Sequence, residues 1–167
     1  MILIVEAYDP GPEKTAFAVL AAGARDALEL VDTGVLPSWG SELQGRILGK
    51  EGGLIAIEGV ANYLASKARA STLFKTCEVV GRLKALAEVA GFEPYVLPAN
   101  APFGKPHWRY NLTGREGAGD AAVKTALKLL FGKAALVGRT NHELDALGLA
   151  VVAARVNWRK FHAIEKR

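Results

Sequence analysis

Two polar side chains stand three residues apart at the start of the most apolar stretch of the chain. His142 and Asp145 precede ALGLAVVAA, residues 146–154, whose composition predicts a buried helix. Side chains three positions apart share one face of a helix, so we expect both to point towards the sheet rather than into solvent. The helix N-terminus disfavours a protonated imidazole, which suits a neutral histidine that binds a metal ion. The alternative is an exposed polar first turn without any chemistry.

The beginning of this helix has its own signal in Thr140 and Glu143. A threonine followed three residues later by a glutamate is a capping box, in which each side chain accepts a hydrogen bond from the other residue's backbone N–H. The capping box gives Glu143 a structural role. It gives none to His142 or Asp145, so these two remain candidates for function.

Two further carboxylates end predicted strands. Asp9 follows ILIVEAY and begins a DPG turn, a common turn sequence that gives a structural alternative for this residue. Glu58 closes LIAIE, a continuous apolar run typical of a strand buried on both faces. A buried carboxylate is unfavourable unless it is paired or binds a cation. Because ligands of α/β sheets bind at the carboxyl ends of strands, we expect Asp9, Glu58, His142 and Asp145 to form one compact acidic site for divalent cations.

The elements that must position these residues follow from hydrophobic periodicity and turn signals. Strands are predicted at 2–8, 15–22, 27–34, 53–60 and 93–98, and helices from Ser41, at 69–90, at 120–131 and from 141, with a long loop at 99–119. The first three strands favour an antiparallel meander. Strands followed by strands mixed with helices fit a single α/β domain over residues 1–167, with a five-stranded mixed sheet flanked by helices.

Composition narrows the class of protein. The chain has 167 residues, half of them hydrophobic, as expected for one globular domain with a real core. It has no basic leader, and its longest apolar run is too short to span a bilayer, so we expect a cytoplasmic protein without membrane contact. The single cysteine, Cys77, allows no internal disulfide and is expected in the core. The net charge of +4 favours a polyanionic partner.

A basic and aromatic segment, GKPHWRYNLTGR at 104–115, is the candidate nucleic-acid contact. Cations fit phosphates, and aromatic rings stack on unpaired bases. The residues concerned are Lys105, His107, Trp108, Arg109, Tyr110 and Arg115. The alternative is a polar loop whose tryptophan packs down as an anchor. Lys67, Arg69 and Lys75, near the long helix, could add phosphate contacts, although most surface lysines are simply solvated.

Taken in order, these motifs resemble the RuvC-type Holliday junction resolvases, which are RNase H-like nucleases. IVEAYDPGPEKTAFAVL resembles the opening strand and turn of that family, and LIAIEGV resembles its second acidic motif. NHELDALGLAVVAAR resembles the C-terminal motif, in which two metal-binding residues sit three apart, and LTGREGAGDAAVKTAL resembles the stretch before a late helix. The resemblance covers nearly the whole chain and implies an RNase H-like fold.

The resemblance also implies the roles of single residues. Asp9 matches the first-strand aspartate, Glu58 the glutamate of the second motif and Asp145 the last aspartate, while His142 matches a position that is aspartate in many members and histidine in some. These four residues would then bind two Mg²⁺ or Mn²⁺ ions, with Asp9 bridging them, and hydrolysis would leave a 5′-phosphate and a 3′-hydroxyl. An imidazole ligand favours metals such as Mn²⁺ beside Mg²⁺.

Two features depart from the family's pattern. A basic residue is frequent where Asp120 stands, which puts that phosphate contact in doubt. The segment after Glu58 looks longer than usual, and Tyr63 is the nearest candidate for the aromatic residue that enters the centre of the junction. Packing within the protein is the alternative role for Tyr63.

We therefore predict a structure-selective DNA endonuclease that resolves Holliday junctions by paired symmetric nicks. Two matched nicks in a branched DNA of two-fold character favour a homodimer, and the resemblance places its interface on the helix around 72–90. The host would be a prokaryotic or phage-infected cell, and a branch-migration helicase remains open as a partner. The alternatives are an RNase H-like nuclease for other branched DNA, RNA or RNA–DNA hybrids, and a non-catalytic nucleic-acid-binding module.

Overall fold

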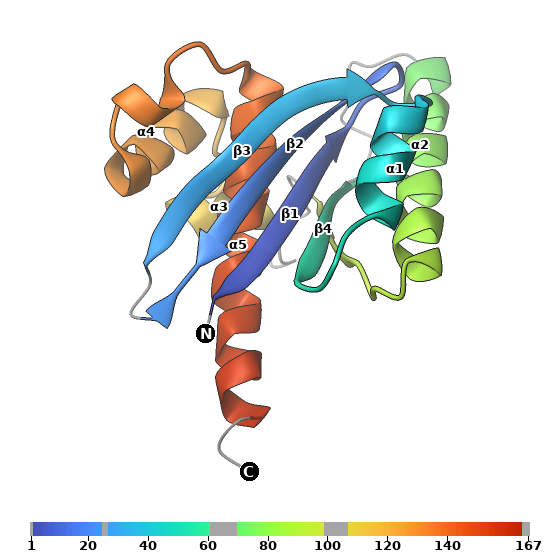
Figure 1. Ribbon diagram of the computed structural model, residues 1–167. Coiled ribbons are helices and arrows are strands. Elements are labelled where there is room, and N and C mark those ends of the chain that lie inside the picture. The colour runs from blue at the N-terminus through green and yellow to red at the C-terminus, as the bar shows by residue number, and fades with distance from the viewer. Residues whose placement is uncertain (1, 25–26, 61–69, 99–106, 165–167) are drawn as a thin grey trace.

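A mixed five-stranded sheet forms the centre of the molecule in the computed structural model, which describes residues 2–24, 27–60, 70–98 and 107–164, with side chains to residue 158 (Figure 1). The described strands are β1 (Leu3–Pro10), β2 (Lys14–Ala22), β3 (Leu28–Pro37), β4 (Leu54–Gly59) and β5 (Tyr95–Pro98). Their order is β3-β2-β1-β4-β5, with β1, β2 and β3 antiparallel and with β4 parallel to both β1 and β5. The predicted meander and mixed sheet are confirmed.

Helices cover both faces of this sheet (Figure 1). One face packs against α3 (Trp108–Thr113), α4 (Asp120–Phe131) and α5 (Asn141–Ile164), with the short 3₁₀ turn Ala134–Leu136 between α4 and α5. The other face packs against α1 (Ser41–Leu48) and α2 (Ala70–Val89). Two hydrophobic cores result, one on each face, and burial of apolar surface in both holds the layers together.

The alternation of side chains along β1 divides its polar residues between the two cores. Residues Leu3, Val5 and Ala7 face the core of α5, and Asp9 follows on the same face because side chains in a strand alternate with a period of two. Glu6 and Tyr8 face the core of α1 and α2. One strand therefore supplies a carboxylate to each face of the sheet.

The predicted capping box of α5 is present. The backbone N–H of Thr140 donates to Glu143 Oε2 at 2.9 Å, and the backbone N–H of Glu143 donates to Thr140 Oγ1 at 3.2 Å. Residues 146–154 that follow are all buried, as predicted. The helix extends to Ile164.

Two expectations about loops and burial are wrong. The predicted loop at 99–119 contains α3, which is too short to show helical periodicity and is held by the burial of Trp108 and Leu112. Cys77 is exposed rather than in the core, because α2 buries only Val79, Leu83 and Ala87 against the sheet.

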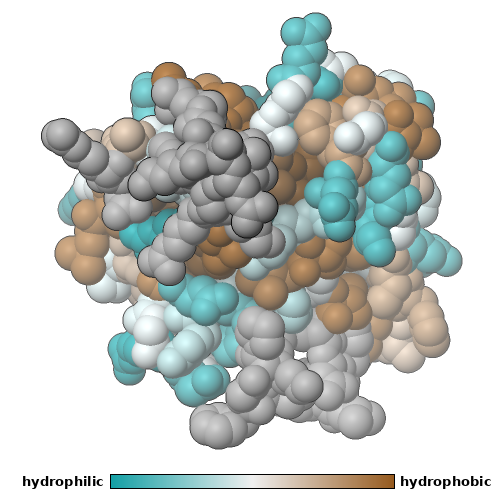
Figure 2. Space-filling model, turned by 90° about the horizontal axis from the view of Figure 1, so that it is seen from below, coloured by the Kyte–Doolittle hydropathy of each residue, from teal (hydrophilic) through white to brown (hydrophobic). Residues whose placement is uncertain are grey.

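Among the described residues, the four predicted metal ligands all lie away from the edge of the sheet where β1 begins. Figure 2 views the molecule from this side and shows hydrophobic surface between hydrophilic residues. A hollow of about 250 Å³ there is lined by residues 2–4, 51–53 and Trp158. Within the described segments, no helix is both long and apolar enough to cross a lipid bilayer.

Candidate metal centre

Three carboxylates from three separate elements meet at the opposite edge of the sheet. Asp9 stands near the end of β1, Glu58 near the end of β4 and Asp145 in the second turn of α5. The parallel pairing of β1 with β4 runs up to Tyr8 and Ile57, so the next residues, Asp9 and Glu58, leave the ladder side by side. One oxygen from each of the three carboxylates lies within 4.8 Å of the others.

This crowding occurs under partial exclusion of water. Asp9 and Asp145 are 8% and 9% exposed, and burial raises the pKa of Asp145 to about 6, against the lowering effect of Arg109. Burial also raises the pKa of Glu58 well above its usual range, and the charges of Asp9 and Asp145 raise it further. A divalent cation among these oxygens would offset both their burial and their mutual repulsion, since it favours the ionised forms of Glu58 and Asp145. Hard oxygen donors in this number suit Mg²⁺ or Mn²⁺.

His142 reaches the cluster from its rim. Its Nδ1 lies 2.6 Å from Asp9 Oδ2, so the imidazole reaches the sheet as expected, but its side chain is 75% exposed and is not shielded from solvent. The residue stands in the first turn of α5, ahead of the buried part of the helix. The hydrogen bond with Asp9 raises the pKa of the imidazole although partial burial lowers it. In the absence of a metal ion the carboxylate of Asp9 therefore favours the protonated imidazole, which opposes the effect expected of the helix N-terminus.

The basic and aromatic segment divides into buried and exposed side chains. Trp108 is completely buried and His107 is 2% exposed, so neither presents its ring to a DNA base. Arg109 is turned inwards and pairs with Asp145 at 2.5 Å and with Asp120 at 2.9 Å. The predicted DNA contacts of these three residues are corrected, because packing and ion pairing inside the protein occupy them. Trp108 instead packs inside the protein as an anchor, which was the alternative interpretation.

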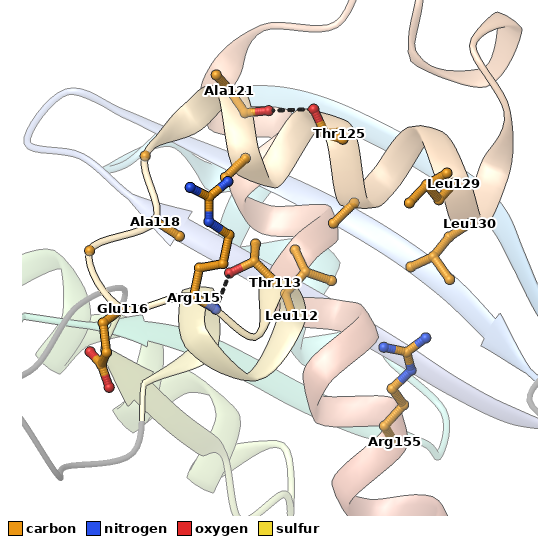
Figure 3. Close-up of a pocket in the computed structure, with 14 residues that line it drawn as sticks. Leu112, Thr113, Arg115, Glu116, Ala118, Ala121, Thr125, Leu129, Leu130 and Arg155 are labelled. Atoms are coloured by element: carbon orange, nitrogen blue, oxygen red, sulfur yellow. Dashed lines mark hydrogen bonds between the residues drawn. The ribbon is translucent and has the colours of Figure 1, made fainter.

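The remaining predicted DNA contacts are exposed or lie outside the described residues. Tyr110, Arg115 and Lys75 are exposed. The other four predicted contacts fall outside the described segments: Tyr63, Lys67, Arg69 and Lys105. Arg115 lines a hollow of about 640 Å³ together with Arg155 of α5 and mainly small or apolar residues of α3 and α4 (Figure 3). None of the clustered carboxylates lines this hollow.

Sequence reasoning missed what Trp108 and Arg109 contact. Trp108 Nε1 donates a hydrogen bond to Glu58 Oε2 at 3.2 Å, and Arg109 Nη2 donates to Asp145 Oδ2 at 2.5 Å. Both residues belong to a helix that the periodicity does not reveal. The sequence did allow Trp108 to be packed inside the protein as an anchor. Nothing in the sequence indicates which carboxylates the side chains of Trp108 and Arg109 contact.

We compared the sequence and the fold of the chain with those of known proteins. No protein-family model and no curated protein matches the sequence. RuvC of T. thermophilus in complex with a Holliday junction substrate matches with a TM-score of 0.70 at 19% identity, over 91% of this chain and 93% of that one. The chain has the RuvC fold. The T. thermophilus RuvC structure matches with a TM-score of 0.66 at 20% identity, over 95% and 96% of the two chains.

A viral protein extends the same fold comparison. The Fowlpox virus resolvase in complex with Holliday junction DNA matches with a TM-score of 0.52 at 11% identity, over 92% of this chain and 98% of that one. The match to RuvC is therefore one of architecture along nearly the full length of each chain, at low sequence identity. The predicted RNase H-like fold is confirmed.

Proposed function

We propose that this chain is a metal-dependent endonuclease that resolves four-way DNA junctions by paired nicks. The observation that carries the proposal is the meeting of Asp9, Glu58 and Asp145 within 4.8 Å at the carboxyl ends of β1 and β4. The RuvC fold adds support, since two of the solved structures that share it are complexes with junction DNA. The +4 net charge agrees with a polyanionic substrate.

The three carboxylates and His142 would hold two Mg²⁺ or Mn²⁺ ions. When bound, such a pair of ions activates water and stabilises the leaving oxygen of a phosphodiester. His142 and Asp9 share a hydrogen bond at 2.6 Å, so a cation that binds His142 through Nδ1 must replace the proton between them.

We propose that the chain acts as a homodimer through α2. Phe74 is 70% exposed and Val89 78%, and Cys77 is exposed, so apolar side chains of this helix remain without packing partners in the single chain. Two nicks placed symmetrically across a junction require two matched sites, which a two-fold dimer supplies. Phe74→Glu should convert dimer into monomer in sedimentation velocity. Leu129→Glu, at an 84% exposed position of α4, is the matched control and should leave the assembly unchanged.

Contacts to DNA are proposed for the exposed residues of the basic segment and of α2. These are Tyr110, Arg115 and Lys75; Tyr63, Lys67, Arg69 and Lys105 are proposed from the sequence alone. We further propose that residues 1–167 form one domain and that the protein works in the cytoplasm of a prokaryotic or phage-infected cell.

The deciding experiment compares nicking of a synthetic four-way junction with nicking of linear duplex, single strand and RNA–DNA hybrid. Each substrate is incubated with Mg²⁺, Mn²⁺ or EDTA, and Asp9→Asn serves as the inactive control. Paired symmetric nicks in the junction alone, abolished by EDTA and by Asp9→Asn, are the expected result. Cleavage mainly of another substrate would contradict the junction assignment, and junction binding without any cleavage would contradict the nuclease.

A further inference from the structure

Two consecutive residues of α3 contact two of the three clustered carboxylates. Trp108 Nε1 donates to Glu58 Oε2, and Arg109 Nη2 donates to Asp145 Oδ2. Glu58 belongs to β4 and Asp145 to α5, so a single helical turn spans the gap between two of the elements that build the site. A carboxylate has two oxygens, so one hydrogen bond fixes its orientation and leaves the second oxygen for a cation.

The position of Trp108 depends on a glycine of α5. A Cβ added to Gly148 would lie 2.6 Å from Trp108 Cζ3 and 3.1 Å from Leu112 Cδ2, so only glycine lets α3 approach α5 this closely. Glycine is otherwise less favourable than alanine in the interior of a helix. Gly148 therefore allows the indole ring to lie completely buried with its N–H at Glu58.

Arg109 is held on several sides. Its guanidinium bridges Asp145 and Asp120, donates to the carbonyl of Ala118 at 3.4 Å and lies 5.3 Å from the centroid of the Trp108 ring. Only 12% of its side chain is exposed. A planar guanidinium locked between two carboxylates determines where Asp145 points, which a mobile surface cation would not.

We infer that Trp108 and Arg109 are positioning residues for the metal site, which orient the carboxylates of Glu58 and Asp145 before metal or DNA binds. The inference rests on the proposed metal-dependent function, and it assigns to α3 the orientation of the carboxylates that would bind the metal. Outer hydrogen-bond partners of metal ligands affect metal affinity by about 10- to 100-fold. The same range is expected here for loss of either contact.

Charge and orientation have opposite effects at Arg109, and the choice of variant must separate them. Removing the positive charge alone would favour a cation nearby, whereas losing the orientation of Asp145 would disfavour it. Arg109→Lys keeps the charge and removes the bridging geometry, so it tests orientation. Trp108→Phe changes no charge, keeps an aromatic ring and removes the N–H that reaches Glu58.

The experiment measures Mn²⁺ binding to the full chain without DNA, by the electron paramagnetic resonance signal of free Mn²⁺. Trp108→Phe and Arg109→Lys should each weaken binding by about 10-fold or more. Two matched controls make the same changes away from the cluster and should bind Mn²⁺ as the wild type does. They are Trp39→Phe, whose Nε1 donates to the carbonyl of Pro12, and Arg46→Lys, which pairs with Glu6 on the other face of the sheet.

A second pair of variants separates positioning from stability. Gly148→Ala should lower both the thermal midpoint and Mn²⁺ affinity, because its Cβ displaces the Trp108 ring. Combined with Trp108→Phe, whose smaller ring relieves the clash, it should recover thermal stability and still bind Mn²⁺ as weakly as Trp108→Phe alone. Metal affinity that simply follows thermal stability through all variants would overturn the positioning role.

The outcomes also distinguish this inference from the proposed function. Wild-type binding that Asp9→Asn abolishes, with unchanged affinity in Trp108→Phe and Arg109→Lys, would overturn the inference and leave the metal site standing. Absence of Mn²⁺ binding to the wild type would overturn both. Weakened binding in the two α3 variants and normal binding in the two controls would establish the positioning role.

Discussion

The two faces of the sheet each bury a cluster of charged side chains, and the clusters differ in their balance of charge. On the face of α1, Glu6 accepts from Tyr8 at 2.8 Å, from Lys50 at 3.3 Å and from Arg46, which also lies 3.7 Å over the ring of Phe17. Two cations of the chain thus surround one buried carboxylate. This cluster needs no partner from outside, and it joins α1 to β1.

On the face of α5, the balance is reversed. The carboxylates of Asp9, Glu58 and Asp145 meet beside one buried guanidinium, that of Arg109, which Asp120 also engages. His142 adds an imidazole at the exposed rim. Since buried carboxylates need counter-charge, an excess of them indicates a site for external cations, whereas the balanced cluster indicates a structural one. Burial alone would not have separated the two.

The largest difference should appear in catalysis. Asp9→Asn should lower the rate of junction cleavage by about a thousandfold or more, because stabilisation of the transition-state charge by metal ions is worth several kcal/mol. Glu6→Gln, three residues earlier on the same strand but facing the other core, should cleave at the wild-type rate when folded. Single-turnover cleavage measures both, and equal losses in the two variants would contradict the distinction between the clusters.

Substitution of Glu6, which should leave the cleavage rate unchanged, should lower the stability of the fold. Glu6→Gln removes the carboxylate that pairs with Lys50 and leaves Arg46 only its contact with Asp32 at 3.4 Å. Breaking a buried ion pair from one side costs about 3–5 kcal/mol of unfolding free energy. Lys50 makes the larger contribution to this cost because only 7% of its side chain is exposed. Urea unfolding checks the prediction, and a loss below about 1 kcal/mol would show that the cluster does not stabilise the fold.

The pH dependence of stability should distinguish the proposed metal site from the cluster at Glu6 when divalent ions are removed with EDTA. The pKa of Asp145 is about 6 in the folded protein, so the folded state binds this proton more tightly than the unfolded state does. Its stabilising contribution is therefore present at low pH and is lost as pH rises from about 4 to about 6. The change amounts to about 3 kcal/mol.

Urea unfolding of the wild type and of Asp145→Asn across that pH range makes the comparison. The difference between the two proteins should change by the predicted amount, with the wild type losing more stability as pH rises. A difference that stays constant between pH 4 and pH 6 would mean that Asp145 ionises in the folded protein as it does in the unfolded chain.

The smallest predicted effect is a gain in stability. Glu58→Gln removes one carboxylate from the crowded cluster and keeps an acceptor oxygen for Trp108. The free energy of unfolding of the metal-free protein should therefore rise by about 1 kcal/mol. The corresponding change at Glu6 destabilises, so the sign alone separates the clusters. Added Mg²⁺ or Mn²⁺ should stabilise the wild type more than Glu58→Gln, and thermal unfolding with and without metal shows this.

Much of the site was predictable because it depends on local pattern. Apolar and β-branched residues predict the two strands that end near Asp9 and Glu58. The Thr140–Glu143 capping box predicts the start of α5. Parallel strands bring their carboxyl ends together, so the meeting of Asp9 and Glu58 follows from the order of the elements. Burial of residues 146–154 of α5 follows from their composition.

What could not be predicted depends on contacts between distant segments. Helix α3 is six residues long, too short for a periodic signal, and exists because Trp108 packs against Gly148. His142 and Asp145 share a helix face by spacing, yet one is largely exposed and the other buried. The difference arises because α5 meets the sheet edge between them, and no property of the helix sequence determines where that edge lies.

The sequence by itself determined the strands, the capped and buried helix and the identity of the carboxylates, because each of these reflects local propensity and hydrophobic pattern. Only the tertiary structure decided that the excess negative charge lies on the face of α5, while Glu6 is balanced by Arg46 and Lys50 on the other face. It also turned Trp108 and Arg109 from the surface to the cluster. Charge balance and side-chain direction depend on which segments pack together, and packing is a property of the whole fold.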